Sequence, residues 1–206
     1  MSSGELGAKD PSAHRQPPRR PGRPARTSKA ALVETVIALG LDSFTLTEVA
    51  ARQGVGESTV YNYVSGRDEL YRVAAASVFE QLDIDVDAST WTGYVDAIAE
   101  RCFALAKSHP GLREYLLYGP YEASTLTIFE ALIDRVQAWL PDIGEHLAYV
   151  LASRPVVTTL AYLDDPVLEP AAPWLRRALL DGLDRALAGG DLPPAPSASW
   201  RTKLRR

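Results

Sequence analysis

Five polar side chains between residues 57 and 64 have the types and the spacing needed to contact DNA. They are Ser58, Thr59, Tyr61, Asn62 and Tyr63. Their hydroxyl and amide groups can bond to base edges and phosphates when a helix lies in a major groove. The segment from Glu57 to Val64 therefore predicts a short helix that recognises DNA.

The residues before this segment predict the element that positions it. Thr45-Leu-Thr-Glu48 is a capping box, in which the Thr45 hydroxyl accepts the Glu48 N–H and the Glu48 carboxylate reaches back. It begins a second short helix, and Gly54 can adopt the left-handed conformation that ends it. Helix, glycine turn and helix together make the helix-turn-helix pattern.

Two features of the segment from Glu57 to Val64 bear on how it would bind DNA. Helical spacing from Val60 and Val64 places Tyr61 partly in the core and Tyr63 on the DNA side. The segment contains no Lys or Arg, and the charge of Glu57 at its start repels phosphate. One alternative therefore stays open, a helical binding or scaffold protein whose helix-turn-helix has lost its affinity for DNA.

Charge is spread unevenly along the 206 residues, which carry a formal net charge of −4. Residues 1–30 hold seven Lys or Arg against two acids, a net +5, whereas residues 31–80 hold three against seven, a net −4. The last six residues hold four basic side chains and no acid. Basic ends on an acidic body indicate a polyanionic partner for the ends.

Residues 1–28 are predicted to be a disordered arm, because they contain five prolines and almost no bulky apolar side chains. Gly22-Arg23-Pro24 resembles the core of an AT-hook, which would lay Arg23 in a narrow A·T minor groove. The alternative is a solubilising tail whose arginines contact phosphates without sequence preference. The arm residues expected to bind DNA are Arg20, Arg23 and Arg26.

The rest of the chain has helical periodicity and no convincing strand alternation, which predicts an all-α protein of about nine helices. Pro110 is expected in the first turn of a short helix, and Pro155 is expected to kink or break a longer one. The expected parts are an arm at 1–28, a helix-turn-helix domain at 29–75, a regulatory and dimerisation domain at 76–188, and a disordered tail at 189–206.

The stretches Phe44 to Ala50, Gly54 to Val64 and Arg67 to Leu70 resemble the tetracycline-repressor (TetR) family of transcription regulators. The resemblance implies that three helices bind DNA, that a fourth leads to a ligand-binding domain, and that the last two long helices form a four-helix dimer interface. It also implies that Arg67 binds a phosphate. The DNA contacts expected in this domain are Thr45, Thr47, Ser58, Thr59, Tyr61, Asn62, Tyr63 and Arg67.

The larger domain is rich in aromatic and hydroxyl side chains, which suit a mostly apolar ligand with a few polar anchors, although each could be ordinary core. The candidates are Tyr94, Cys102, Phe103, Tyr115, Tyr118, Tyr121, Phe129, Trp139 and Tyr162. Two apolar stripes exceed what one core needs and predict a homodimer. They comprise Leu147, Val150, Leu151, Trp174, Ala178, Leu179, Gly182, Leu183 and Ala186.

The sequence lacks the motifs that are typical of enzymes, metal-binding proteins and membrane proteins. We find no glycine-rich phosphate loop, nucleophile elbow or zinc-protease motif, and one Cys and three His give little material for catalysis, a metal site or a cofactor. No apolar run approaches the roughly 20 residues of a membrane span, and no signal peptide is evident. We expect a cytoplasmic dimeric repressor that a small molecule releases from a palindromic operator. An activator and a ligand-independent regulator are the alternatives.

Overall fold

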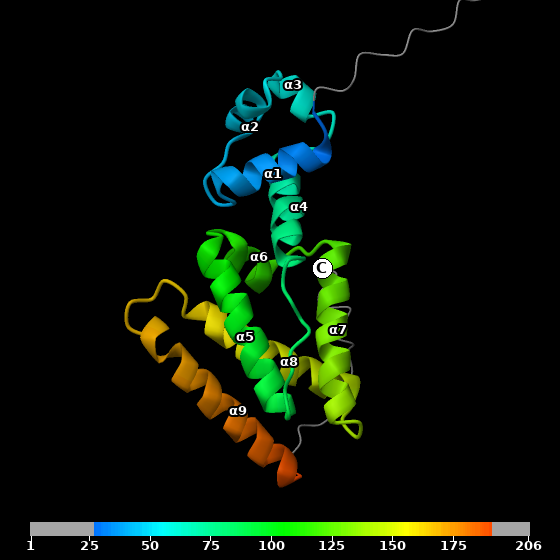
Figure 1. Cartoon of the computed structure of the whole chain (residues 1–206), viewed down its shortest axis with the longest axis vertical. Coiled ribbons are helices and arrows are strands. Elements are labelled where there is room, and N and C mark those ends of the chain that lie inside the picture. The colour runs from blue at the N-terminus through cyan, green and yellow to red at the C-terminus, as the bar shows by residue number, and fades with distance from the viewer. Residues whose placement is uncertain (1–26, 191–206) are drawn as a thin grey trace, which may run out of the picture.

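The computed structural model describes residues 27–190, and every regular element within them is a helix. Nine α-helices and one short 3₁₀ helix occur in this part of the chain, which confirms the all-α prediction there. Figure 1 shows two bodies stacked along the long axis of the molecule, with α1 to α3 at one end and α5 to α9 at the other. Helix α4 joins them.

The smaller body consists of α1 (Lys29–Leu39), α2 (Leu46–Gln53) and α3 (Glu57–Val60). The expected capping box is present at the start of α2, and Gly54 ends that helix with φ 63° and ψ 33°, the left-handed conformation. Buried side chains from all three helices and from the loop between α1 and α2 form its core. They include Leu32, Val36, Phe44, Val49 and Val60.

Helix α3 is shorter than the expected helix from 57 to 64, because it ends at Val60 and residues 61–63 form turns. The amides of Asn62 and Tyr63 bond to the carbonyls of Thr59 and Val60, at 3.2 and 2.9 Å. These are i to i+3 bonds, which tighten the last turn of a helix and rotate the side chains that follow.

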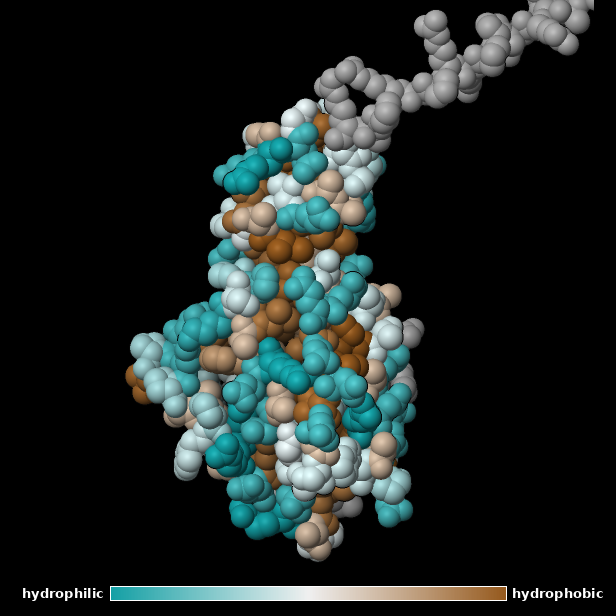
Figure 2. Space-filling view, viewed as in Figure 1, coloured by the Kyte–Doolittle hydropathy of each residue, from teal (hydrophilic) through white to brown (hydrophobic). Residues whose placement is uncertain are grey.

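Helix α4 (Arg67–Phe79) belongs to both bodies. It packs against α1, and its contacts with α6 and α7 lie in the larger body. Ala74, Ala75 and Ala76 are buried, and these small side chains let neighbouring helices approach closely. The view in Figure 2 shows hydrophobic residues at the surface where α1 crosses α4.

The larger body is built around α8, which packs against α5, α6, α7 and α9. The elements of the larger body are α5 (Trp91–Ser108), α6 (Leu112–Tyr118), α7 (Ala123–Trp139), α8 (Glu145–Ala161), the 3₁₀ helix η1 (Glu169–Ala171) and α9 (Ala172–Ala188).

None of the helices within residues 27–190 is long and apolar enough to cross a membrane.

Two prolines bear on the helix boundaries that the sequence predicted. Pro155 does not break α8, which continues to Ala161, and burial of Pro155 among packed helices offsets the backbone hydrogen bond that it cannot donate. A kink at Pro155 stays a prediction. Pro110 precedes α6 instead of occupying its first turn, because Gly111 is the N-cap. Gly111 has a φ of 96° and lies against the backbone of Leu41 and Asp42, which links α6 to the smaller body.

Candidate nucleic-acid interface and ligand sites

Helices α2 and α3 form one end of the molecule (Figure 1), and this end carries an exposed set of polar side chains. The exposed members of the predicted set within the described residues are Thr45, Thr47, Ser58, Tyr61, Asn62 and Arg67, the last at the start of α4. Thr59 and Tyr63 are half-buried. The helix-turn-helix thus brings side chains from two helices onto one polar surface.

Hydrogen bonds hold two of these side chains in place. The Thr45 hydroxyl accepts the Glu48 N–H at 3.2 Å and donates to Glu48 Oε2 at 2.8 Å, so it is engaged in the capping box. The Thr47 hydroxyl donates to Oε2 of Glu57 at 2.8 Å, which ties the start of α2 to the start of α3. The carboxylate of Glu57 is therefore fixed beside the exposed residues of both helices.

The exposures of the two tyrosines are the reverse of the expectation. The Tyr61 side chain is 52% exposed, whereas Tyr63 packs on the core and its hydroxyl donates to the carbonyl of Thr27 at 2.9 Å. The expectation was wrong because it continued α-helical spacing past Val60, where the chain follows turns instead. Of the two side chains, that of Tyr61 is the more exposed.

Arg67 fastens α4 to the loop between α1 and α2. Its Nε donates to the carbonyl of Phe44 at 3.1 Å and its Nη2 to that of Asp42 at 3.0 Å, while the guanidinium lies 4.6 Å from the centre of the Phe44 ring. The structure thus shows an anchoring role, and a phosphate contact by Arg67 stays a prediction. Arg20, Arg23 and Arg26 lie outside the described residues.

Glu69 makes a second tie between α1 and α4. Its carboxylate accepts hydrogen bonds from Nζ of Lys29 at 2.8 Å and from the amide and hydroxyl of Ser65 at 2.7 and 2.8 Å. These bonds, that of Lys29 above all, lower the pKa of Glu69 from 4.5 to about 2. The ionised carboxylate of Glu69 thus adds a polar contact to the apolar packing of α1 on α4.

Two of the predicted ligand contacts, Tyr121 and Phe129, line an apolar cavity of about 80 Å³ between α6, α7 and α8. Its walls also contain Leu116, Leu132, Ile133, Tyr149, Ala152, Ser153, Val156 and Val157. Oγ of Ser153 is buried and has no hydrogen-bond partner within the described residues, which gives the cavity one unused polar group.

Three further candidates are core side chains outside this cavity. The Tyr94 hydroxyl donates to the carbonyl of Ile84 at 3.2 Å, and burial raises the pKa of Cys102 to about 12. The Tyr115 hydroxyl accepts the Glu122 N–H at 2.9 Å. These residues were chosen because helical periodicity marks an inward face, and it does not distinguish a cavity wall from solid core.

Tyr118, Trp139 and Tyr162 also lie outside the cavity. Tyr118 is 77% exposed and Trp139 is 41% exposed, so the structure corrects their assignment to a pocket. The reason is positional, since Tyr118 and Trp139 are the last residues of α6 and α7, where the chain turns away from the core. Tyr162 follows α8 as its C-cap and is half-buried.

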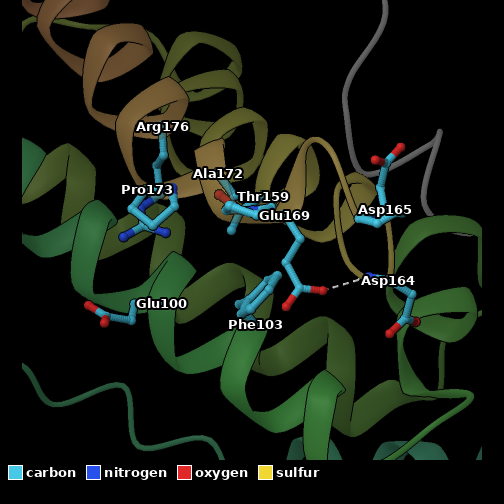
Figure 3. A pocket seen from close by; sticks show the side chains of 11 residues that line it. Glu100, Phe103, Thr159, Asp164, Asp165, Glu169, Ala172, Pro173 and Arg176 are labelled. Atoms are coloured by element: carbon cyan, nitrogen blue, oxygen red, sulfur yellow. Dashed lines mark hydrogen bonds between the residues drawn. The ribbon is translucent and has the colours of Figure 1, made fainter.

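Phe103 lines a different site, an open cleft of about 450 Å³ between α5, the end of α8, η1 and α9. Figure 3 shows its ring beside Glu169, whose carboxylate accepts the amide of Asp164 at 2.9 Å. Arg176 is buried here with its Nε on a carboxylate oxygen of Asp96. Sequence reasoning missed this cleft, whose only early signal was the run of acids and prolines from 164 to 173. No cluster of His, Cys, Asp and Glu within the described residues could hold a metal ion.

The predicted dimer stripes are partly exposed in the single chain. Trp174 is 69% exposed, Ala178 is exposed, and a Cβ added at Gly182 would meet nothing within 4 Å. Leu151 must be removed from the set, because it is buried in the core of its own chain. The remaining members are half-buried, namely Leu147, Val150, Leu179, Leu183 and Ala186.

Comparison of the chain with known proteins identifies solved structures that share its fold. No protein-family model and no curated protein sequence matches the chain. A TetR variant from Acinetobacter baumannii AYE, solved in complex with minocycline, matches with a TM-score of 0.60 and 18% identity over 76% of this chain and 94% of that one. The chain has the fold of the TetR-family repressors.

A second solved structure supports the same fold. AlkX, a TetR-family repressor from a Dietzia species implicated in the biodegradation of n-alkanes, matches with a TM-score of 0.53 and 14% identity. The match covers 77% of this chain and 96% of AlkX. Both matches span nearly the full length of the known structures, so the likeness includes the larger body as well as the helix-turn-helix.

Proposed function

We propose that this protein is a transcription regulator that binds DNA as a homodimer and represses from a palindromic operator. One observation carries the proposal. A complete helix-turn-helix, with its capping box, its left-handed Gly54 and an exposed polar surface, stands at the end of a molecule with the fold of TetR-family repressors. Regulators of this kind place the second helix of the motif in the major groove.

The exposed side chains fall into two groups, those suited to base edges and one suited to a phosphate. Ser58 and Asn62 are short and exposed, which suits hydrogen bonds to base edges. Tyr61 is longer, and its hydroxyl suits a phosphate beside the groove. Two such surfaces related by a two-fold axis would bind a palindrome, and the exposed face of α8 and α9 around Trp174 and Gly182 is the surface we assign to the symmetric contact.

We assign effector binding to the apolar cavity that Tyr121 and Phe129 line. Its volume of about 80 Å³ is well below the roughly 300–1,000 Å³ of ordinary ligand pockets, so a ligand would have to displace the walls. A small, mostly apolar molecule with one group for Ser153 suits its lining. A ligand that prefers the expanded state would shift the population toward it.

The cavity is connected to α4 by contacts between aromatic rings. The Tyr121 ring lies 5.6 Å from that of Tyr115, which lies 6.4 Å from that of Tyr71 on α4. The Tyr71 hydroxyl donates to the carbonyl of Gly111 at 2.7 Å. Displacement of α6 and α7 would therefore reorient α4, which carries the helix-turn-helix, and would move two dimer-related recognition surfaces out of register.

Selection of binding sites from a random duplex library with the full-length protein tests this function. We expect a palindrome whose half-sites are centred about 10 base pairs apart or a multiple of that distance. Enrichment of no sequence by folded, dimeric protein would contradict the proposal. That outcome would favour a helical scaffold protein, which the acidity of the helix-turn-helix domain would then explain.

A further inference from the structure

Glu57 is an acidic side chain at a position where a DNA-binding surface is expected to attract phosphate. It is exposed, it is the first residue of α3, and its Oε2 accepts the hydroxyl proton of Thr47 at 2.8 Å. Its Oε1 makes no hydrogen bond within the described residues. The N-terminal residues of a recognition helix are the ones that contact base edges. The unused oxygen thus stands where a base edge would approach.

The chemistry of the major groove limits what a carboxylate there can bind. A carboxylate only accepts hydrogen bonds, and the only major-groove donors are the amino groups of cytosine N4 and adenine N6. Adenine N6 lies between two acceptors, its own N7 and O4 of the paired thymine. Cytosine N4 has an acceptor on one side only, O6 of guanine, so a carboxylate meets less repulsion at cytosine.

We propose that Glu57 recognises a cytosine in each operator half-site and that Thr47 positions its carboxylate. This inference rests on the DNA-binding function proposed above and adds a residue that sets specificity. Oε2 stays on Thr47 while Oε1 accepts the N4–H. Guanine and thymine present only acceptors at this position and are rejected.

The same charge disfavours unrelated sequences. Residues 53–66 contain no Lys or Arg, so nothing in the recognition segment neutralises the repulsion between Glu57 and phosphates. The contribution of this segment to binding is then favourable only where a correctly placed amino group offsets that repulsion. The repulsion weakens binding to DNA sites that lack the correct base, and such repulsion contributes to specificity in other selective interfaces.

Glu57→Gln separates this role from a purely structural one. The glutamine oxygen can still accept the Thr47 hydroxyl, and a glutamine amide pairs with N6 and N7 of adenine. Site selection with the variant should replace cytosine by adenine at one position in each half-site, with about a tenfold change in relative affinity there and an unchanged remainder of the palindrome. Affinity for unrelated duplex should rise, because a negative charge is removed from each protomer.

Two further variants complete the experiment. Thr47→Val removes the hydroxyl and should weaken the preference for cytosine without creating one for adenine. Glu34→Gln removes an exposed carboxylate from α1 and should leave the selected sequence unchanged. The same base preference in wild type and Glu57→Gln would overturn the inference while the DNA-binding function stands. Failure of the wild-type protein to select any site would remove both.

Discussion

Several side chains of the helix-turn-helix are held in position by hydrogen bonds within the protein. Thr47 holds Glu57, Thr45 holds Glu48, and Arg67 holds the loop between α1 and α2 through two carbonyls. Side chains that are already ordered lose less conformational entropy on binding. Such preorganisation favours selective recognition by a surface that has little positive charge of its own.

Glu69 should make the stability of the protein depend on pH. Glu69→Gln should lower the free energy of unfolding at pH 7 by about 1 kcal/mol, because it weakens the bonds to Lys29 and Ser65. The folded-state pKa is about 2, below the ordinary 4.5, so the stabilisation is fully present above about pH 4.5 and is lost as the pH falls toward 2.

Urea unfolding of wild type and Glu69→Gln at pH 7 and near pH 2.5 measures this effect. The difference between the two proteins should shrink at the lower pH. Glu100→Gln is the matched control, since Glu100 is exposed, and it should change stability little at either pH. An equal loss of unfolding free energy in Glu69→Gln at both pH values would contradict this account of Glu69.

Among the helices, the boundaries that depend on nearby residues were predictable from the sequence. Thr45, Glu48 and Gly54 fix both ends of α2 by local bonds and backbone preference, and the capping box was found where expected. The end of α3 was not predictable, because its last turn tightens as the chain approaches α4. The error over Tyr61 and Tyr63 followed directly from that turn.

Features that depend on packing were predicted less well. Pro155 is accommodated in a continuous α8, and Leu151 is buried in its own chain, because of helices distant in sequence. Tyr121 and Phe129 line a cavity, whereas Tyr94 and Cys102 share their pattern and lie in solid core. Periodicity identifies an inward face, and only the arrangement of the helices decides where space remains on it.

The contact between Gly111 and the loop at Leu41 joins α6 to the smaller body. In Gly111→Ala the new Cβ would lie 2.8 Å from the Asp42 nitrogen and 3.0 Å from the Leu41 Cβ, at a φ of 96° that alanine rarely adopts. We expect a loss of about 2–3 kcal/mol in unfolding free energy, measured with urea. Gly189→Ala is the control and should change stability little, because Gly189 has a φ of −80° and the nearest neighbour of its new Cβ would lie 3.4 Å away. Equal stability of the two variants would show that this contact is not tight.

The two ends of the molecule have separate roles in this account. Figure 1 places α2 and α3 at one end of the long axis and α9 at the other, with α4 between the bodies. A symmetric contact through α8 and α9 would therefore fix the separation of two helix-turn-helix units from a distance. Small rotations at the dimer contact or along α4 would be enlarged at the DNA.

Gly182→Arg should convert the dimer into monomers that remain folded. A Cβ added at this position meets nothing within 4 Å in the single chain, so the chain itself leaves room where the arginine begins and the proposed partner would not. Sedimentation velocity measures the result, with Asp134→Arg, at an exposed position on α7, as the charge control. Persistence of the dimer in Gly182→Arg would place the interface elsewhere.

The basic arm should supply much of the electrostatic attraction to DNA. Its arginines at 19, 20, 23 and 26 lie outside the described residues, and residues 31–80 carry three basic against seven acidic side chains. Each phosphate neutralised adds about 0.9 to the slope of log affinity against log salt, so deletion of residues 1–26 should reduce the slope by roughly two to four units. Replacing the four arginines by glutamine should match the deletion. Equal slopes for full-length and truncated protein would show that the arm does not contact phosphates.

The most direct test of DNA recognition by the helix-turn-helix uses Ser58→Ala and Asn62→Ala. Both side chains are exposed, so folding and dimerisation should not change, and Thr127→Ala on α7 serves as the control. Fluorescence anisotropy at fixed salt would measure affinity for the selected operator and for an unrelated duplex. Each variant should lose about 1–3 kcal/mol of operator affinity and little affinity for the unrelated duplex. Unchanged operator affinity in both variants would contradict the assignment of DNA recognition to this surface.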